Sequence, residues 1–186
     1  MWRLPEHAEK VFSGIVFDVW QWEQELFDGS TTTFEAIERE WTALILAVQN
    51  DTILVTHQRQ PQKPDRYRDL LWWRVPRWVD HLTQAKKELR EEAGMEAWVW
   101  EVLRTRNDKG YSFRDTQYFI ARDLKIVGEQ QLDPWGEEIE VKALTFDEFV
   151  EKFCTGEMGN EYEQAKILRM KMYGWLEDFR KQLFGK

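Results

Sequence analysis

Three carboxylates lie within five consecutive residues of a segment that has the pattern of a helix. Glu88 and Glu92 are spaced one helical turn apart, and Glu91 lies beside them. Carboxylate oxygens that converge in this way suit Mg²⁺ or Mn²⁺, which leave coordination positions for water and phosphate. The same spacing is also typical of a solvated charged helix face. The residues alone therefore leave a divalent-metal site and a charged surface as alternatives.

The helix that must position these carboxylates is well marked in the sequence. Asp80 is a favoured N-cap residue, and Gly94 is the residue type that commonly follows a helix C-terminus. Apolar residues recur along one helical face, namely Leu82, Ala85, Leu89 and Ala93. We therefore expect a helix from about residue 80 to residue 94 that buries this face and keeps the carboxylates beside it.

This segment resembles a Nudix box. The family pattern is a Gly, five residues, a Glu, seven residues and then Arg-Glu-aliphatic-x-Glu-Glu-x-Gly-aliphatic. When Glu88 is placed on the Glu of the Arg-Glu pair, four later residues fall on family positions without a gap: Glu91, Glu92, Gly94 and Met95. Residues 53–61, 118–124 and 137–141 are also similar to strands and a loop of the ADP-ribose pyrophosphatase branch.

The resemblance implies an α+β protein with a Nudix fold, in which a mixed β-sheet is sandwiched between helices. It also implies an N-terminal antiparallel β-hairpin or sheet extension at residues 1–40, which such pyrophosphatases commonly exchange between two subunits. Residues 41–186 would then form the Nudix domain with a C-terminal helix. A homodimer is the expected assembly.

The activity implied by the resemblance is Mg²⁺- or Mn²⁺-dependent hydrolysis of ADP-ribose or another nucleoside diphosphate-linked small molecule. Glu88, Glu91 and Glu92 occupy the positions of the metal ligands, and Glu91 and Glu92 are counted among the catalytic residues. A later acidic loop often supplies the base in this family, so Glu137 and Glu138 are the candidates here. An ordinary turn before a strand explains these two residues equally well.

Three positions depart from the family pattern. Trp73 stands where the box begins with Gly, Val79 where it has its first Glu, and Lys87 where it has Arg. Trp73 cannot adopt positive φ as readily as Gly does, and Val79 has no carboxylate. Lys87 lacks the planar guanidinium with which Arg forms two parallel hydrogen bonds. Weakened support around a metal costs about 10–100-fold in affinity or activity, so we expect weakened or lost hydrolysis.

The sequence contains 11 tryptophans, and several of them flank the predicted helix. Residues 72–79 are expected to form an apolar loop, and a strand after the helix would place two more rings on one face. The aromatic residues concerned are Trp72, Trp73, Trp78, Trp98 and Trp100. The alternative function is therefore a repurposed or engineered scaffold whose Trp-rich loop binds an aromatic ligand, a protein partner or a second copy. Core packing in a divergent family member is the other interpretation.

Length and composition restrict the remaining possibilities. A chain of 186 residues that is 42% hydrophobic suits one well-buried core. The net charge of −8 argues against a nucleic-acid backbone or an anionic membrane as the main partner. Cys154 is the single cysteine, and no apolar run approaches a membrane span or a signal sequence. We expect a soluble, cytoplasmic protein.

Hydrophobic periodicity and turn residues predict the other elements. Strands are expected at residues 11–25, 31–37, 42–48, 52–56, 98–103, 111–121 and 139–144, with a loop at 60–65 and a turn at 107–110. Thr145 and Glu148 have the spacing of a capping box, which predicts a helix to about residue 154. A last helix is expected at about residues 161–183.

Overall fold

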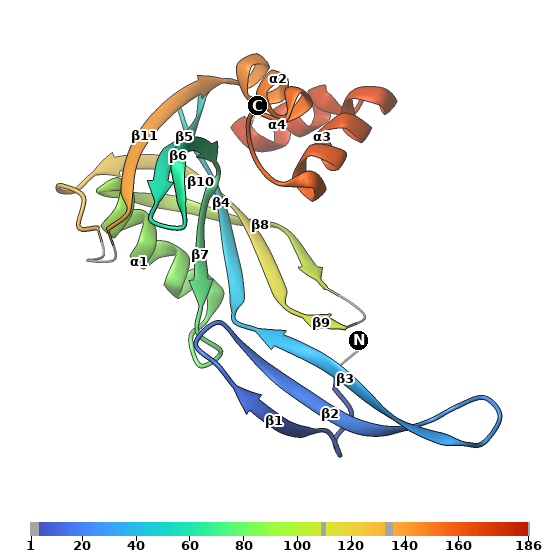
Figure 1. Cartoon of the computed structure of the whole chain (residues 1–186). Coiled ribbons are helices and arrows are strands. Elements are labelled where there is room, and N and C mark those ends of the chain that lie inside the picture. The colour runs from blue at the N-terminus through green and yellow to red at the C-terminus, as the bar shows by residue number, and fades with distance from the viewer. Residues whose placement is uncertain (1–3, 109–110, 133–135, 186) are drawn as a thin grey trace.

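The computed structural model describes residues 4–108, 111–132 and 136–185, in which the chain forms two β-sheets and four helices (Figure 1). The elements in chain order are β1 (Glu9–Ser13), β2 (Phe17–Glu25), β3 (Thr31–Arg39), β4 (Trp41–Gln49), β5 (Thr52–Gln60), β6 (Lys63–Asp69), β7 (Leu71–Val75), α1 (His81–Ala93), β8 (Met95–Asn107), β9 (Ser112–Phe113), β10 (Asp115–Ile126), β11 (Glu138–Thr145), α2 (Phe146–Thr155), α3 (Glu161–Tyr173) and α4 (Leu176–Phe184).

The larger sheet has seven strands and is mixed. Its main path runs β11-β5-β4-β10-β8, while β6 pairs with β5 and β7 pairs with β4. The central strand β4 is parallel to β10 and antiparallel to β5 and β7. A central strand with both faces covered reads as a continuous apolar run, and residues 42–48 of β4 are all buried.

Helices cover both faces of this sheet and divide the core into two clusters (Figure 1). Alternate residues of β4 serve the two sides, because side chains alternate along a strand. Ala43 and Ile45 pack with Leu89 of α1, whereas Leu44 and Leu46 belong to the cluster under α2, α3 and α4. The expected sandwich of a mixed sheet between helices is therefore confirmed.

The N-terminal strands form a second sheet that extends away from the body of the molecule (Figure 1). Strands β1, β2 and β3 are antiparallel neighbours, and β3 also pairs in parallel with the short β9. The Arg77 guanidinium fastens this sheet to the body through ion pairs with Glu38 at 2.9 Å and Asp18 at 3.5 Å. The expected antiparallel extension is present, while its treatment as a separate domain ending at residue 40 stays a prediction.

Four predicted elements are wrong. The strand at 111–121 is divided into β9 and β10, because Arg114 between them is not in a strand. The single strand at 11–25 is two strands, because the chain reverses at Gly14, whose N–H donates to the Phe17 carbonyl at 3.0 Å. The loop at 60–65 is partly strand, since β6 begins at Lys63 and pairs with β5 at the margin of the sheet. The last helix is two helices, because Gly174 adopts φ +74° and ends α3.

Other expectations are confirmed. Asp80 and Gly94 bound α1, and the capping box formed by Thr145 and Glu148 opens α2. The predicted turn at 107–110 lies partly outside the described residues. None of the described helices is long and apolar enough to cross a membrane.

Candidate functional site

The helix α1 is held at both ends by the residues that predicted it. The Asp80 carboxylate accepts from the Thr83 N–H at 2.9 Å, which satisfies one of the unpaired amides of the first turn. That hydrogen bond also holds the pKa of Asp80 below its ordinary value. At the other end Gly94 adopts φ +63°, and Ala85 and Leu89 are buried against the sheet.

The loop that follows β10 lies directly against the C-terminal end of α1. The Val127 N–H donates to the Gly94 carbonyl at 2.9 Å. A Cβ atom at position 94 would lie 2.4 Å from the Gly128 carbonyl oxygen, which is far inside a van der Waals contact. Gly94 is therefore required twice, once for its positive φ and once for this close approach.

Gln130 joins the helix to the start of β11. Its side-chain amide donates to the Glu92 carbonyl and lies 3.4 Å from the Ile139 carbonyl, while the neighbouring Gln131 N–H donates to the Glu91 carbonyl at 2.7 Å. These contacts bring the acidic turn of α1 and the acidic start of β11 together. Sequence reasoning missed Gln130, because a lone Gln in a loop carries no pattern.

The carboxylates of Glu88 and Glu91 are paired with groups of their own helix. The Lys87 ammonium lies 3.0 Å from Glu91 Oε2 and 4.0 Å from Glu88 Oε1, and the Gln84 amide donates to Glu88. In the described part of the chain, no three His, Cys, Asp or Glu side chains gather closely enough to hold a metal ion. As these side chains stand, they do not form a site for Mg²⁺ or Mn²⁺, and a metal at these residues would require Glu88 and Glu91 to leave these partners.

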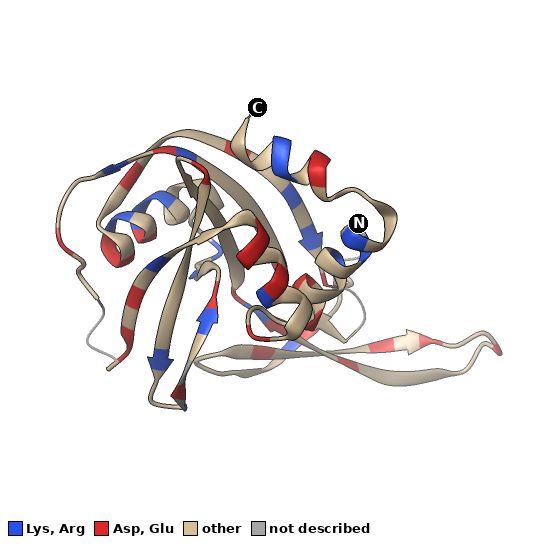
Figure 2. Cartoon of the chain, turned by 90° about the horizontal axis from the view of Figure 1, so that it is seen from above, with Lys and Arg blue, Asp and Glu red and all other residues tan. Residues whose placement is uncertain are grey.

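Glu137 and Glu138 are held by the end of β5. The Arg59 guanidinium donates to Glu138, its partner in the β5–β11 register, and the Gln60 amide lies 3.5 Å from Glu137 Oε2. Both residues therefore lie where a turn leads into a strand. Across the wider surface, basic and acidic residues are interspersed along strands and helices (Figure 2).

Comparison with known proteins supports the fold alone. No protein-family model matches the chain, and no curated protein sequence matches it either. A crystal structure of an ADP compounds hydrolase matches with a TM-score of 0.68, covers 93% of each chain and shares 17% sequence identity. The chain has a Nudix fold. At this identity the likeness carries no activity from one protein to the other.

The altered first half of the Nudix box has a structural explanation. Trp73 lies on β7, opposite Ala43 of β4, and only 5% of its surface is exposed. It is a core residue of the α1 face, so a strand replaces the expected glycine turn. Val79 follows in a turn, where its N–H donates to the Pro76 carbonyl at 2.9 Å, and its side chain packs against the same core cluster.

The predicted Trp-rich loop is wrong in most of its members. Trp72 and Trp73 point to opposite faces of the sheet and pack in the two core clusters. Trp100 packs edge-on against Phe119 at 6.0 Å and is partly buried, so it forms no shared aromatic face with Trp98. The rings of Trp72, Trp73 and Trp100 pack in the core instead of offering a binding surface. Only Trp78 and Trp98 of the five are exposed, by 84% and 78%.

Proposed function

We propose that this protein binds a nucleoside diphosphate-linked small molecule, such as ADP-ribose, across α1 and the start of β11, and hydrolyses it weakly. One observation carries the proposal: Gln130 joins the carbonyl of Glu92 to that of Ile139. This bridge between the two backbones supports a shared surface for the α1 carboxylates and those of Glu137 and Glu138. The full-length likeness to an ADP compounds hydrolase supports the same choice of substrate class.

Local cations compensate for the overall charge of −8 at this surface. Lys87 is 57% exposed on α1, and Arg59 is half exposed at the end of β5. Each is paired with a carboxylate, so a phosphate must compete with Glu91 or Glu138 for its cation. Exposed ion pairs of this kind are worth about 0–1 kcal/mol, which makes that competition feasible and the affinity dependent on salt.

Weak hydrolysis follows from the residues that replace the box. Glu88, Glu91 and Glu92 stand at the positions of the metal ligands in the Nudix pattern. In this chain the Lys87 ammonium is paired with Glu91 and Glu88, and Val79 supplies no carboxylate. A divalent metal at these residues would therefore have to compete with the Lys87 ammonium for Glu88 and Glu91. The expected deficit is about 10–100-fold relative to a restored box.

The direct test is incubation with ADP-ribose and Mg²⁺ while AMP is measured. We expect slow AMP release that Glu92→Gln abolishes and that Val79→Glu combined with Lys87→Arg accelerates. Trp73 stays unchanged in this test because it is part of the core. Release equal in the wild type and Glu92→Gln would show that α1 performs no hydrolysis, and absence of ADP-ribose binding would reject the proposal itself.

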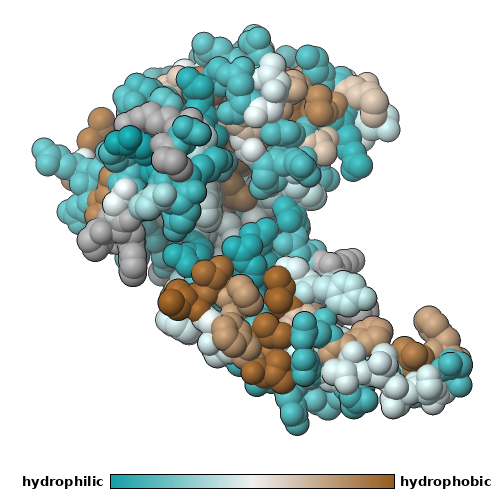
Figure 3. Space-filling view, in the orientation of Figure 1, coloured by the Kyte–Doolittle hydropathy of each residue, from teal (hydrophilic) through white to brown (hydrophobic). Residues whose placement is uncertain are grey.

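A second proposal concerns the N-terminal sheet, which we infer pairs with a second copy of this chain. Its apolar side chains are not covered within one chain, and Figure 3 shows them gathered over β1 and the β1–β2 turn. The exposed residues are Val11, Phe12, Ile15, Val16 and Phe17, with Ile15 exposed by 94%. Trp78 borders the same groove. Contiguous apolar patches of this kind are typical of interfaces.

Sedimentation velocity tests the second proposal. We expect a dimer for the wild type and a monomer for Ile15→Asp combined with Phe17→Asp. Met172→Asp is the control, because Met172 is also apolar and exposed but lies on α3, away from this sheet. A monomeric wild type, or a dimer that survives the double change, would contradict the pairing.

A further inference from the structure

A cavity of about 290 Å³ lies between the seven-stranded sheet and the C-terminal helices, on the face of the sheet opposite α1. Its walls are mostly apolar and include Leu46, Phe149, Phe153, Ile167, Met170 and Phe179. The exposed Trp175 and Asp178 mark its mouth at the junction of α3 and α4. This size is at the lower end of ligand pockets, which span about 300–1,000 Å³.

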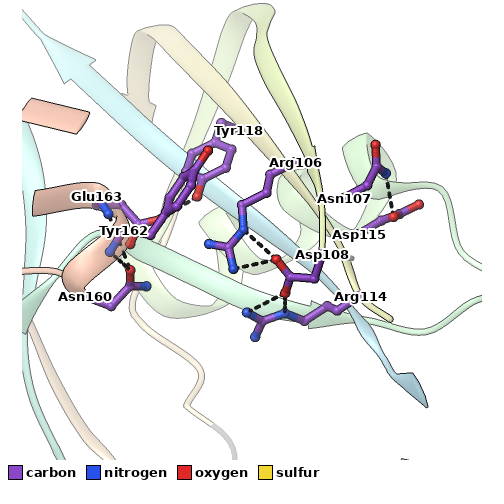
Figure 4. A network of polar contacts seen from close by, with 9 residues as sticks. All are labelled: Arg106, Asn107, Asp108, Arg114, Asp115, Tyr118, Asn160, Tyr162 and Glu163. Carbon is purple, nitrogen blue, oxygen red and sulfur yellow. Dashed lines mark hydrogen bonds and ion pairs between the residues drawn. The ribbon is translucent and has the colours of Figure 1, made fainter. Parts of the chain in front are cut away.

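A buried carboxylate lines this mostly apolar space. Glu163 is 6% exposed, and its Oε1 accepts the Tyr118 hydroxyl proton, as Figure 4 shows. Burial and this bond to Glu163 together raise the pKa of Tyr118, so its hydroxyl remains a donor. Glu163 Oε2 is buried and has no hydrogen-bond partner among the described residues. A buried acceptor without a hydrogen bond lowers stability by about 1–3 kcal/mol, and by more when it is charged. A ligand that donates a hydrogen bond to it would remove this penalty.

A buried donor packs against the same tyrosine. The Arg104 guanidinium is stacked over the Tyr118 ring at 3.9 Å, and Arg104 also lines the cavity. Arg104 Nε is buried and likewise has no partner in the described chain. One unpaired acceptor and one unpaired donor are thus both anchored on Tyr118.

The surrounding contacts hold these groups in place. Asn160 caps α3 and accepts from the Glu163 N–H at 3.4 Å, while Arg106 lies 4.2 Å from the Tyr162 ring centre and is paired with Asp108 (Figure 4). The carboxylate also lies in the first turn of α3, where the helix dipole favours negative charge. The site is therefore built before any ligand enters.

We propose that this cavity binds a small, mainly apolar molecule that carries an amide or lactam edge. The ligand N–H donates to Glu163 Oε2, and its carbonyl oxygen accepts from Arg104 Nε. A neutral ligand fits best, because the charged residues that line the cavity are balanced, with Arg104 and Lys166 against Glu163 and Asp178. The apolar walls cover the remainder of the molecule. This binding site is separate from the surface of α1 and does not depend on hydrolysis there.

The test uses 2-quinolinone as the probe and its 1-methyl derivative as the matched control, which keeps the shape and carbonyl but lacks the N–H. Binding to the full chain is followed by protein NMR and by Trp fluorescence, since Trp175 lies at the mouth. We expect saturable binding of 2-quinolinone and binding of the methyl derivative about tenfold or more weaker.

Two variants locate the interaction. Glu163→Gln replaces the unpaired acceptor with a donor and should weaken 2-quinolinone about tenfold or more, whereas Glu161→Gln makes the same change at an exposed position of the same helix and should have no effect. Met170→Trp fills the cavity, leaves Glu163 in place and should abolish binding even if Glu163→Gln does not fold.

Several results would overturn the proposal. The proposal is wrong if 2-quinolinone shows no saturable binding, if its methyl derivative binds equally well, or if Glu163→Gln or Met170→Trp binds 2-quinolinone as the wild type does. A crystal structure with the probe in which only water contacts Glu163 Oε2 would also contradict it.

Discussion

Asp69 at the end of β6 is a charged group placed where its charge is unfavourable. Burial, assisted by the nearby Glu163 carboxylate, raises its pKa from 3.8 to about 6, although the Leu70 N–H donates to Oδ1 at 2.8 Å and acts in the opposite direction. The folded protein therefore binds more protons than the unfolded chain between about pH 4 and pH 6. It follows that the free energy of unfolding should fall as pH rises through this window.

The change Asp69→Asn removes the charge and keeps the oxygen that accepts from Leu70. A pKa raised by about two units corresponds to about 3 kcal/mol, and the partial exposure of Asp69 lowers this to about 1–3 kcal/mol. We expect the variant to be more stable by that amount at pH 8 and no more stable than the wild type at pH 4. The melting temperature at pH 8 should rise by about 2–12 °C.

Urea unfolding of the wild type and Asp69→Asn at closely spaced pH values between 4 and 8 measures this directly. The difference between the two curves removes the contributions of other titrating groups. Asp65→Asn is the matched control, because Asp65 is exposed on the same strand and should shift neither stability nor its pH dependence. A constant difference across the pH range would refute the reasoning about the buried charge.

Three further predictions concern the packing around the two faces of the sheet, and each is measured by urea unfolding at pH 7. Gly94→Ala should lower the free energy of unfolding by at least about 2 kcal/mol, because its Cβ would overlap the Gly128 carbonyl. Gly174→Ala has open space around it and should lower it by only about 1 kcal/mol. Equal losses would contradict the close approach at Gly94. Tyr118→Phe should cost about 1–3 kcal/mol because it leaves the buried carboxylate without its donor, and an unchanged stability would show that water replaces the hydroxyl. Trp73→Ala should cost about 3–5 kcal/mol and Trp78→Ala less than about 0.5 kcal/mol, and similar values would contradict their assigned burial.

Local chemistry made the helix and its boundaries predictable. The N-cap of α1, its terminal glycine and the capping box of α2 are each determined by residues within a few positions of one another. Continuous runs of residues that favour strands also identified β4 and β5. A period of two cannot show where a strand reverses, so the turn at Gly14 within residues 11–25 was missed.

Tertiary packing determined what the sequence could not show. The sequence predicts a loop at residues 72–79, because the Nudix pattern has a glycine and an acidic residue there. The large apolar surfaces of Trp72 and Trp73 are instead buried when β7 joins β4. The hydrogen bonds of Gln130 with Glu92 and of Tyr118 with Glu163 join residues far apart in sequence. Local sequence patterns do not predict such contacts, and these contacts define both proposed binding sites.

The central claim is that the α1 surface still recognises a nucleoside diphosphate-linked molecule while its altered box hydrolyses it slowly. The most direct measurement is ³¹P NMR of ADP-ribose with the protein and Mg²⁺, for the wild type, Glu92→Gln and Val79→Glu combined with Lys87→Arg. We predict slow AMP formation by the wild type, none by Glu92→Gln and about 10–100-fold faster formation by the restored variant. ADP-ribose resonances unchanged by the protein, with no AMP from any of the three, would contradict the account.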